Sequence, residues 1–363
     1  MNWKNIEGLD GVESPGLLVD SDKIQQNIDR MIEIVGGAEH VDRLFPHVKT
    51  HKMPEVTRMQ VDAGITKFKA ATLSEAQMAA GAGASEVLIA HQLVGPKLDR
   101  LATLIEDFPN TKFAVLTDDP QAADAINEKC GDADSPLDVY IDIDCGMHRT
   151  GIPLGARSDA LRAHIDSLSG LNFAGLHVYD GHLHDPDLQQ RTDKVKEILG
   201  KVALHEKEHP SPRIIVGGSP TFGIWAAETD WHLSPGTTLL WDFGYGDAHP
   251  DLPMTIAAAL ISRVISKPGE GKICIDLGHK SIAAEMPLEK RFQFPDLPDA
   301  QPIGQSEEHL VLQTANAASL HVGDIVIAIP RHICPTVALH SHATVVSGGR
   351  VTGERWQVTA RDR

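Results

Sequence analysis

The chain has 363 residues, and its 50 acidic against 33 basic side chains give a formal net charge of -17 at pH 7. Domains commonly span about 100–200 residues, so the length suffices for a large core plus a second domain. The acidic balance argues against a nucleic-acid partner, whose phosphates attract a basic face. No apolar run approaches the roughly 20 residues that cross a bilayer, and the polar N-terminus does not resemble a secretory signal. Because four scattered cysteines cannot build a disulfide framework, we expect a soluble, cytoplasmic protein.

The first 250 residues alternate apolar, β-branched runs with helical segments, which is the pattern of βα units. A strand at Pro15–Asp20 precedes a helix that Ser21 caps and Gly36-Gly37 ends. Helices are also expected near Ser74–Ala82, Asp119–Lys129, Asp159–Leu168 and Arg191–Glu208. The eight further strands are expected near Phe45–Thr50, Lys67–Thr72, Glu86–His91, Lys112–Thr117, Leu137–Asp144, Phe173–Asp180, Ile214–Gly217 and Asp230–Leu233. Eight βα units predict an α/β fold, a (β/α)8 TIM-type barrel.

From about residue 250 the sequence changes to short alternating runs separated by turn residues, such as "KICIDLG" and "DIVIAIP". This pattern predicts an all-β domain at the C-terminal end. We therefore expect a barrel over residues 21–248 and a β domain over residues 249–363, to which the strand within residues 1–20 is added.

The segment "FPHVKTHK" (Phe45 to Lys52) concentrates two His and two Lys in an acidic chain. Taken alone, such a cluster is as well explained by a solvated turn. It lies, however, on and after the first expected barrel strand, and barrel active sites form at the C-terminal ends of strands. A partly desolvated Lys49 in that position is a competent amine nucleophile toward an aldehyde, and a Schiff base is the favoured chemistry.

Two Gly-rich loops, "VGGSPTF" and "LSPGTTL", follow the seventh and eighth expected strands. In barrels these loops commonly bind phosphate through exposed backbone N–H groups. Each loop alone is more simply a turn. Together with Lys49 they describe a phosphate and an aldehyde held across one barrel, which suggests pyridoxal 5'-phosphate.

The motifs "SPGLLVD", "PHVKTHK", "IDIDCGMHRTGI", "GLHVYDGHLH", "VGGSPTF", "LSPGTTLLWD" and "RHICPTVAL" follow one another in this order. In this respect the chain resembles the D-threonine aldolase and D-serine dehydratase family of fold-type III pyridoxal-phosphate enzymes, related to the N-terminal domain of alanine racemase. The resemblance covers nearly the whole chain. It implies a head-to-tail homodimer and a small-molecule D-β-hydroxy-amino acid substrate.

The resemblance also assigns the site. It implies that Lys49 carries the cofactor, with His51 beside it, and that Arg149 approaches the phenolic oxygen of the cofactor. It implies catalytic roles for Lys49, His51, Tyr179 and Asp180. The remaining cofactor-binding residues that it implies are Tyr179, Gly217, Gly218, Ser219, Gly236, Thr237 and Asp242.

A metal site is expected at "PRHICPTVALH", where His332 and Cys334 stand two apart. We expect an extended segment here, in which both side chains point to the same face. Imidazole and thiolate are good ligands for Zn²⁺ and acceptable ones for other divalent ions such as Mn²⁺ or Mg²⁺. Two protein ligands leave open positions, which suits a catalytic ion. A lone His-x-Cys is usually accidental, but this one matches the metal segment of the family.

Three positions depart from the family pattern. Phe45 stands where the family commonly has Arg, and Asp180 stands where the aldolases often carry His. The second metal ligand is Cys334, as in the dehydratases, whereas the aldolases commonly use Asp. The proton-transfer group is therefore open, with His177, His182 and His184 nearby in sequence.

The expected reaction is the metal-assisted retro-aldol cleavage of a D-threonine-like substrate to glycine and an aldehyde. The alternative is dehydration of D-serine or 3-hydroxyaspartate to a 2-oxo acid and ammonia. A two-base racemase is less favoured, because such enzymes usually take a Tyr from the β domain and none of the three Tyr falls after residue 248. A non-catalytic pyridoxal-phosphate carrier would not need the C-terminal domain.

Overall fold

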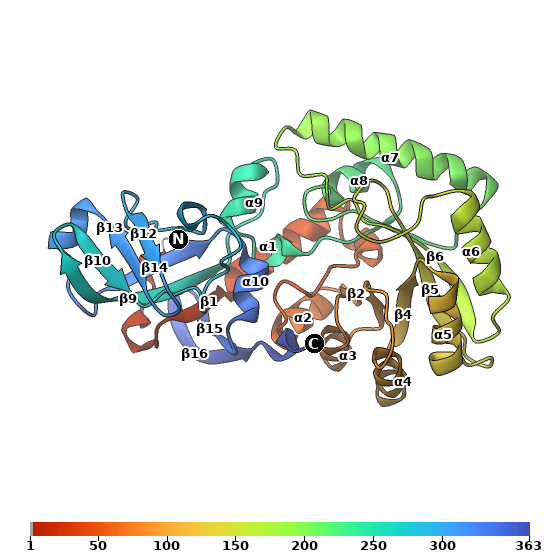
Figure 1. The fold of residues 1–363 in the computed structure, drawn as a ribbon, viewed down its shortest axis with the longest axis horizontal. Helices are drawn as coiled ribbons and strands as arrows, with labels where there is room; N and C mark the ends of the chain where they lie inside the picture. The colour runs from red at the N-terminus through yellow and green to blue at the C-terminus, as the bar shows by residue number, and fades with distance from the viewer. Residues whose placement is uncertain (1–2) are drawn as a thin grey trace. The chain divides into compact units, whose positions relative to one another are not determined.

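The computed structural model describes residues 3–363, which form two compact units. The barrel unit comprises residues 29–49, 54–236 and 362–363. The β unit comprises residues 3–28, 50–53 and 237–361. Each unit is therefore assembled from segments that are distant in the sequence, and each contains its own sheet (Figure 1).

The barrel unit is built on a curled sheet of seven parallel strands, whose spatial order follows the chain from β2 to β8. Helices connect successive strands, as parallel pairing requires. The strands are β2 (Lys67–Ala70), β3 (Glu86–Ile89), β4 (Lys112–Thr117), β5 (Leu137–Ile143), β6 (Leu171–Val178), β7 (Ile214–Val216) and β8 (His232–Leu233). The helices are α2 (Pro54–Asp62), α3 (Leu73–Gly81), α4 (Lys97–Asp107), α5 (Pro120–Cys130), α6 (Ala156–Asp166), α7 (Leu188–Glu208) and α8 (Phe222–Glu228).

Residues 44–48 occupy the remaining place in the barrel, between β8 and β2. Leu44 bridges Leu233 of β8, and His47 bridges Lys69 of β2, both in parallel. The barrel expected from the sequence is thus confirmed, but a regular first strand at Phe45–Thr50 is wrong. Pro46 has no N–H to donate to a ladder, so single bridges replace continuous pairing.

The interior of the barrel is filled by a cluster of buried side chains from residues 44–48 and from the consecutive strands β3 to β7. Because these side chains pack tightly, the barrel is a solid core, and its chemistry is confined to the ends of the strands. The cluster contains Phe45, Leu88, Ala114, Leu116, Tyr140, Ala174 and Ile215.

The β unit holds a sheet of nine strands, in which the path β12-β13-β10-β9-β1-β15-β16 is extended by β14 and β11. β1 pairs in parallel with β15 and antiparallel with β9, so the N-terminal strand lies inside the C-terminal sheet. The strands are β1 (Gly16–Asp20), β9 (Ala258–Gly269), β10 (Lys272–Ile275), β11 (Phe292–Gln293), β12 (Gln301–Gln305), β13 (Leu310–Gln313), β14 (Ile325–Pro330), β15 (His342–Ser347) and β16 (Arg350–Gln357). α9 (Phe243–Ala248) and α10 (Ile333–Ala338) are short helices of this unit, and α1 (Ser21–Ile34) runs from it into the barrel unit.

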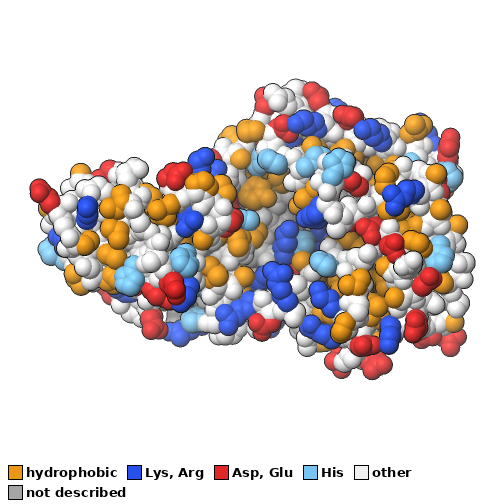
Figure 2. Space-filling view, viewed as in Figure 1, with side chains coloured by type: hydrophobic (Ala, Val, Ile, Leu, Met, Phe, Trp, Pro, Cys, Tyr) orange, Lys and Arg blue, Asp and Glu red, His pale blue; other side chains and the backbone are white. Residues whose placement is uncertain are grey.

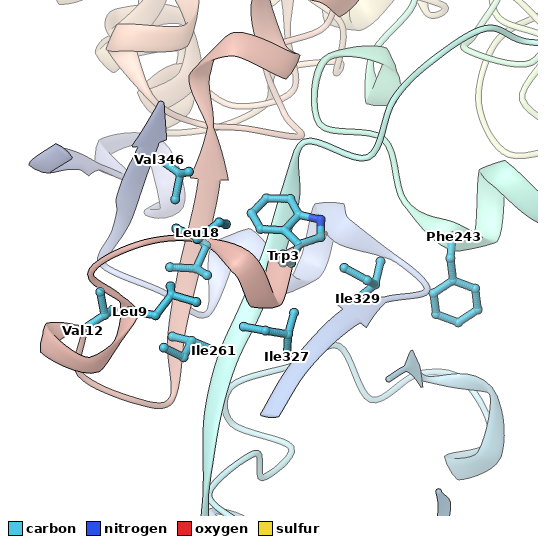
Figure 3. Close-up of a cluster of buried hydrophobic side chains, with 11 residues drawn as sticks. Trp3, Leu9, Val12, Leu18, Phe243, Ile261, Ile327, Ile329 and Val346 are labelled. Carbon is cyan, nitrogen blue, oxygen red and sulfur yellow. The ribbon is translucent and has the colours of Figure 1, made fainter. Parts of the chain in front are cut away.

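The core of the β unit gathers apolar side chains from both ends of the chain (Figure 3). Trp3 and Leu9 of the N-terminal segment pack with Leu18 of β1 and with Ile261 and Ile327 of the central strands. Full burial of each such side chain contributes about 1.5–3 kcal/mol. The N-terminal residues therefore help to hold this unit together.

On the face that Figure 2 shows, acidic and basic side chains are both spread over the surface, and hydrophobic ones are scattered among them. Exposed large apolar side chains such as Val94 and Val322 belong to different units. Among the described residues, no helix is both long enough and apolar enough to cross a membrane.

Candidate active site

Lys49 lies at the mouth of the barrel, directly after the bridging segment. The backbone of this segment is fixed on both sides, since His47 N–H donates to the Pro235 carbonyl (2.7 Å) and Val48 N–H donates to the Lys69 carbonyl (2.9 Å). The Lys49 side chain is half-buried and lines a cavity of about 420 Å³. This volume falls in the range of small-molecule sites, about 300–1,000 Å³.

Tyr179 follows β6 and lines the same cavity, with three cationic groups around its ring. The Lys49 and Lys69 Nζ atoms lie 6.0 Å and 5.2 Å from the ring centroid, and Arg149 Cζ lies 5.2 Å away. Three of the predicted residues, Lys49, Arg149 and Tyr179, are thus brought together. Because a small cavity with three cations and few carboxylates favours anionic ligands, this end of the barrel suits a negatively charged compound.

A chain of polar groups beside Tyr179, which the sequence did not predict, runs from the exposed Thr150 inward to the buried Lys69. Thr150 Oγ1 donates to Asp142 Oδ2 (2.9 Å), and Asp142 Oδ1 is 2.7 Å from His177 Nδ1. His177 Nε2 is in turn 3.3 Å from Lys69 Nζ. The two ends of the last contact come from β2 and β6, which are not neighbours in the sheet, so Lys69 points into the barrel.

These groups change one another's ionisation. Burial, followed by the positive charge of Lys49, lowers the pKa of Lys69 to about 7. Burial also lowers the pKa of His177. Burial opposes ionisation of Asp142, but its hydrogen bonds with His177 and Thr150 outweigh it and lower its pKa. Asp142 is therefore an anion that holds a neutral imidazole in one orientation.

Asp180 is close in sequence to Tyr179 but does not line the cavity. Its carboxylate is fully buried and accepts hydrogen bonds from Trp225 Nε1 (2.7 Å) and Thr221 Oγ1 (2.9 Å). Burial raises the pKa of Asp180 to about 6. The Asp180 carboxylate thereby holds α8 and the loop before it in place.

His51 lies in the β unit and is fully buried. Its Nδ1 accepts the Met53 N–H (3.2 Å), so Nε2 carries the hydrogen, and this Nε2 has no hydrogen-bond partner among residues 3–363. Burial lowers the pKa of His51 to about 3, which keeps the ring neutral. A buried donor without an acceptor is uncommon in proteins and indicates a place for a ligand or a water.

The two Gly-rich loops meet at Ser219, whose Oγ accepts the Gly236 N–H (3.0 Å). The Gly218 N–H donates to Thr221 Oγ1 (3.1 Å) and the Gly217 N–H to the Val178 carbonyl (3.2 Å). The N–H groups of these three glycines, which were expected to hold phosphate, are thus engaged within the protein.

Next to these loops, Ser234 directly follows β8 and was not singled out from the sequence. Its Oγ is buried without a hydrogen-bond partner in the part of the chain that the structure describes. A half-buried lysine, a cavity of suitable size, an excess of cations and this unpaired hydroxyl together fit pyridoxal phosphate.

His332 and Cys334 lie at the start of a helix, which corrects the expectation of an extended segment. His332 is the N-cap of α10, and Cys334 is in its first turn. Pro335 is compatible with a first helical turn, where a missing N–H costs no hydrogen bond. The side chains of His332 and Cys334 nevertheless form a hydrogen bond. Partial burial opposes protonation of His332, but its hydrogen bonds with Cys334 and Glu285 outweigh burial and raise its pKa to about 9.

Thr237 and Asp242, two of the predicted cofactor-binding residues, lie beside His332 and Cys334 within the β unit. Cys334 Sγ is 3.1 Å from Thr50 Oγ1 and 3.5 Å from Thr237 Oγ1. Asp242 accepts the Ile333 N–H (2.9 Å), which anchors α10, and burial raises the pKa of Asp242 to about 6. Within residues 3–363, no group of three or more His, Cys, Asp or Glu side chains is arranged around a metal position. An ion held by His332 and Cys334 therefore needs further ligands from water or substrate.

The chain matches two family models along most of its length. Residues 19–242 match the alanine racemase N-terminal domain, and residues 257–346 match a putative serine dehydratase domain. The chain is 28% identical to a D-threonine aldolase of Arthrobacter sp over 360 residues, covering 96% of this chain and 93% of that protein. It is 25% identical to a D-threo-3-hydroxyaspartate dehydratase of Delftia sp. over 360 residues, covering 90% and 92%. The crystal structure of a D-threonine aldolase from Filomicrobium marinum superposes with a TM-score of 0.87 at 28% identity, covering 97% of each chain.

Proposed function

The chain belongs to the family of the alanine racemase N-terminal domain, and its relatives include aldolases and dehydratases; we propose that it is a pyridoxal-phosphate-dependent lyase of D-β-hydroxy-α-amino acids. The reaction we propose is the retro-aldol cleavage of D-threonine-like substrates to glycine and an aldehyde. A divalent ion, Zn²⁺, Mn²⁺ or Mg²⁺, assists it.

The observation that carries the aldolase assignment is the full-length likeness to D-threonine aldolases. Sequence and structure give the same 28% identity over at least 93% of both chains. The likeness includes the C-terminal unit, which a minimal cofactor-binding barrel would not need. The sequence "PTVAL" after Cys334 resembles the aldolase branch, although Cys334 itself does not.

The residues of the barrel unit have distinct roles in this proposal. Lys49 Nζ supplies the amine that attaches the cofactor, and the Tyr179 ring supports it with Arg149 close by. When bound, pyridoxal phosphate acts as an electron sink for the bond that breaks at Cα. Ser219 and Gly236 join the phosphate-binding loops, and the Ser234 hydroxyl offers an additional polar contact.

In this proposal, residues of the β unit form a metal site that acts on the hydroxyl group of the substrate. His332 and Cys334 would hold the divalent ion, which lowers the pKa of a coordinated hydroxyl. Thr50 Oγ1 and Asp242 orient these ligands, the first at Cys334 Sγ and the second through the Ile333 N–H. Such outer contacts commonly change metal affinity by about 10–100-fold.

Cys334 itself favours a second candidate, the dehydration of D-serine or D-threo-3-hydroxyaspartate to a 2-oxo acid and ammonia. A thiolate is a softer ligand than the carboxylate common in aldolases, and it selects Zn²⁺ over Mn²⁺ or Mg²⁺. The likeness to the dehydratase of Delftia sp. supports this alternative at 25% identity.

The purified enzyme should be incubated with D-threonine and with D-serine, each with and without a chelator. We expect glycine and acetaldehyde from D-threonine, their loss with the chelator, and their return with a divalent ion. A His332→Ala variant should behave as the chelated enzyme does. Predominant formation of ammonia and 2-oxo acid would establish the dehydratase instead. L-threonine serves as the stereochemical control, and equal turnover of it would contradict the proposal.

A further inference from the structure

Lys69 is a buried cation whose hydrogen-bonding capacity is largely unused. Its side chain lines the cavity, and the residue is only 2% exposed. An ammonium group has three N–H donors, and one of them faces His177 Nε2 at 3.3 Å. No other hydrogen-bond partner of this ammonium is found in the described part of the chain. Since buried charges are normally paired, the other donors call for an anionic acceptor inside the cavity.

The polar chain behind Lys69 aims this ammonium group. Asp142 is bonded by Thr150 and by His177 Nδ1, so the His177 hydrogen lies on Nδ1 and Nε2 presents its lone pair to Lys69. One donor of Lys69 is thereby engaged, while the side chain also lines the cavity. A cation that only stabilised the core would not border a ligand-sized cavity.

Arg149 borders the same cavity and lies at the same distance as Lys69 from the Tyr179 ring, 5.2 Å. Their charges act on one another: the positive charges of Lys49 and Arg149 both contribute, after burial, to lowering the pKa of Lys69. An anion that enters between these cations relieves their repulsion.

We propose that Lys69 binds an anionic oxygen of the ligands of this cavity beside Arg149, which the family resemblance already implies at the phenolic oxygen, with His177 and Asp142 as positioning residues for Lys69. This inference rests on the proposed function. The anionic oxygen belongs either to the ring of the cofactor attached to Lys49 or to the carboxylate of the substrate. Both sources offer the same chemistry, and experiment distinguishes them.

The first arm uses 4'-deoxypyridoxine 5'-phosphate, which lacks the aldehyde and so binds without reacting with Lys49. The absorbance of its ring reports ionisation of the 3-hydroxyl group. If Lys69 binds the ring oxygen, Lys69→Met should raise the pH at which the bound hydroxyl ionises by about one to three units. Lys69→Gln keeps a polar partner for His177 and should shift it in the same direction, should the Met variant fold poorly.

The second arm uses the cofactor-loaded enzyme and D-alanine, which has no β-hydroxyl group and is not cleaved. If Lys69 binds the substrate carboxylate, Lys69→Met should weaken D-alanine binding about tenfold or more, measured by the change in cofactor absorbance. Binding of D-alaninol, which has no carboxylate, should not change.

Lys67→Met is the matched control, because Lys67 lies two residues earlier on the same side of β2, outside the cavity lining, with Nζ bonded to the Asp42 carbonyl (3.0 Å). It should leave both readouts unchanged. Unchanged readouts in folded Lys69 variants would overturn the inference, as would equal shifts in Lys67→Met. Failure of the wild-type protein to bind the analogue would overturn the proposed function together with this inference.

Discussion

Two lysines of "PHVKTHK" stand three residues apart, and their surroundings separate their roles. Lys49 lines the cavity of the barrel unit. Lys52 lies in the β unit, where its Nζ donates to the Ala360 carbonyl (3.3 Å). We expect borohydride to trap a phosphopyridoxyl group on Lys49, located by peptide mass spectrometry. Lys52→Ala should retain the adduct and Lys49→Ala should lose it, together with the yellow absorbance. An adduct mapped to Lys52 would contradict the site.

The burial of Asp180 predicts how the stability of the protein depends on pH. Its pKa rises from 3.8 to about 6 on burial, so the folded state favours the protonated form. Its favourable contribution is fully present below about pH 4 and is lost as the pH rises through 6. Two pKa units correspond to about 3 kcal/mol. Relative to wild type, Asp180→Asn should therefore gain stability as the pH increases from 4 to 7, by at most this amount.

Urea denaturation of both proteins across this pH range measures the difference. Other carboxyl groups titrate in the same range, and the subtraction removes their contribution. If the difference in unfolding free energy between the two proteins stays constant with pH, burial does not raise the pKa of Asp180.

At the scale of elements, Gly175 decides how β6 meets β7. Its φ is +143°, and a Cβ atom here would stand 1.8 Å from the Arg213 carbonyl oxygen. Gly175→Ala should therefore force β6 away from β7 and destabilise the protein by about 3 kcal/mol or more. The same strand carries His177 and leads into Tyr179, so cofactor binding should weaken as well. Thermal unfolding and cofactor titration measure the two effects.

Gly200→Ala is the control for this substitution. Gly200 lies within α7, and nothing stands within 4 Å of a Cβ atom placed there. Alanine in a helix interior is favoured over glycine by about 1 kcal/mol, so this variant should be slightly more stable. Equal effects of the two substitutions would show that the close approach of β6 and Arg213 does not limit stability.

The elements also show where sequence patterns stop being informative. Alternating βα segments predicted the barrel, because hydrophobic periodicity reflects burial directly. They did not predict that Pro46 would interrupt the first strand, since its neighbours remain apolar and buried. The expectation of an extended segment holds for the backbone of His332, the N-cap, but is wrong at Cys334, because Pro335 suits the first turn of a helix as well as a strand edge.

Sequence motifs identify some residues of the candidate site but not those whose position depends on the fold. Lys49, Arg149 and Tyr179 stand in motifs, and the structure places all three along one cavity. Lys69 sits in "KFKAAT", where alternation with Phe68 indicates a strand but not which face the lysine occupies. Its contact with His177 depends on the curvature that brings β2 opposite β6. Ser234 likewise became a candidate only once its hydroxyl was seen to be buried and unpaired.

At the scale of the whole molecule, one of the several points at which the chain passes from one unit to the other lies between Lys49 and Thr50. The lysine proposed for the cofactor belongs to the barrel unit, and the next residue contacts Cys334 in the β unit. The lysine proposed for the cofactor and the proposed metal ligands therefore belong to different units. Removing either should abolish stabilisation by one ligand and preserve stabilisation by the other.

The last prediction follows from this division. A ligand that binds only the folded state adds about 2.7 kcal/mol at 100 times its Kd. Calorimetry of the cofactor-free, chelated protein should show a higher melting temperature after addition of Zn²⁺ or of pyridoxal phosphate alone. His332→Ala should lose the response to Zn²⁺ and keep the response to pyridoxal phosphate, whereas Lys49→Ala should do the reverse. If Zn²⁺ stabilises His332→Ala as strongly as wild type, the ion binds elsewhere, and the assignment of His332 and Cys334 as its ligands is wrong.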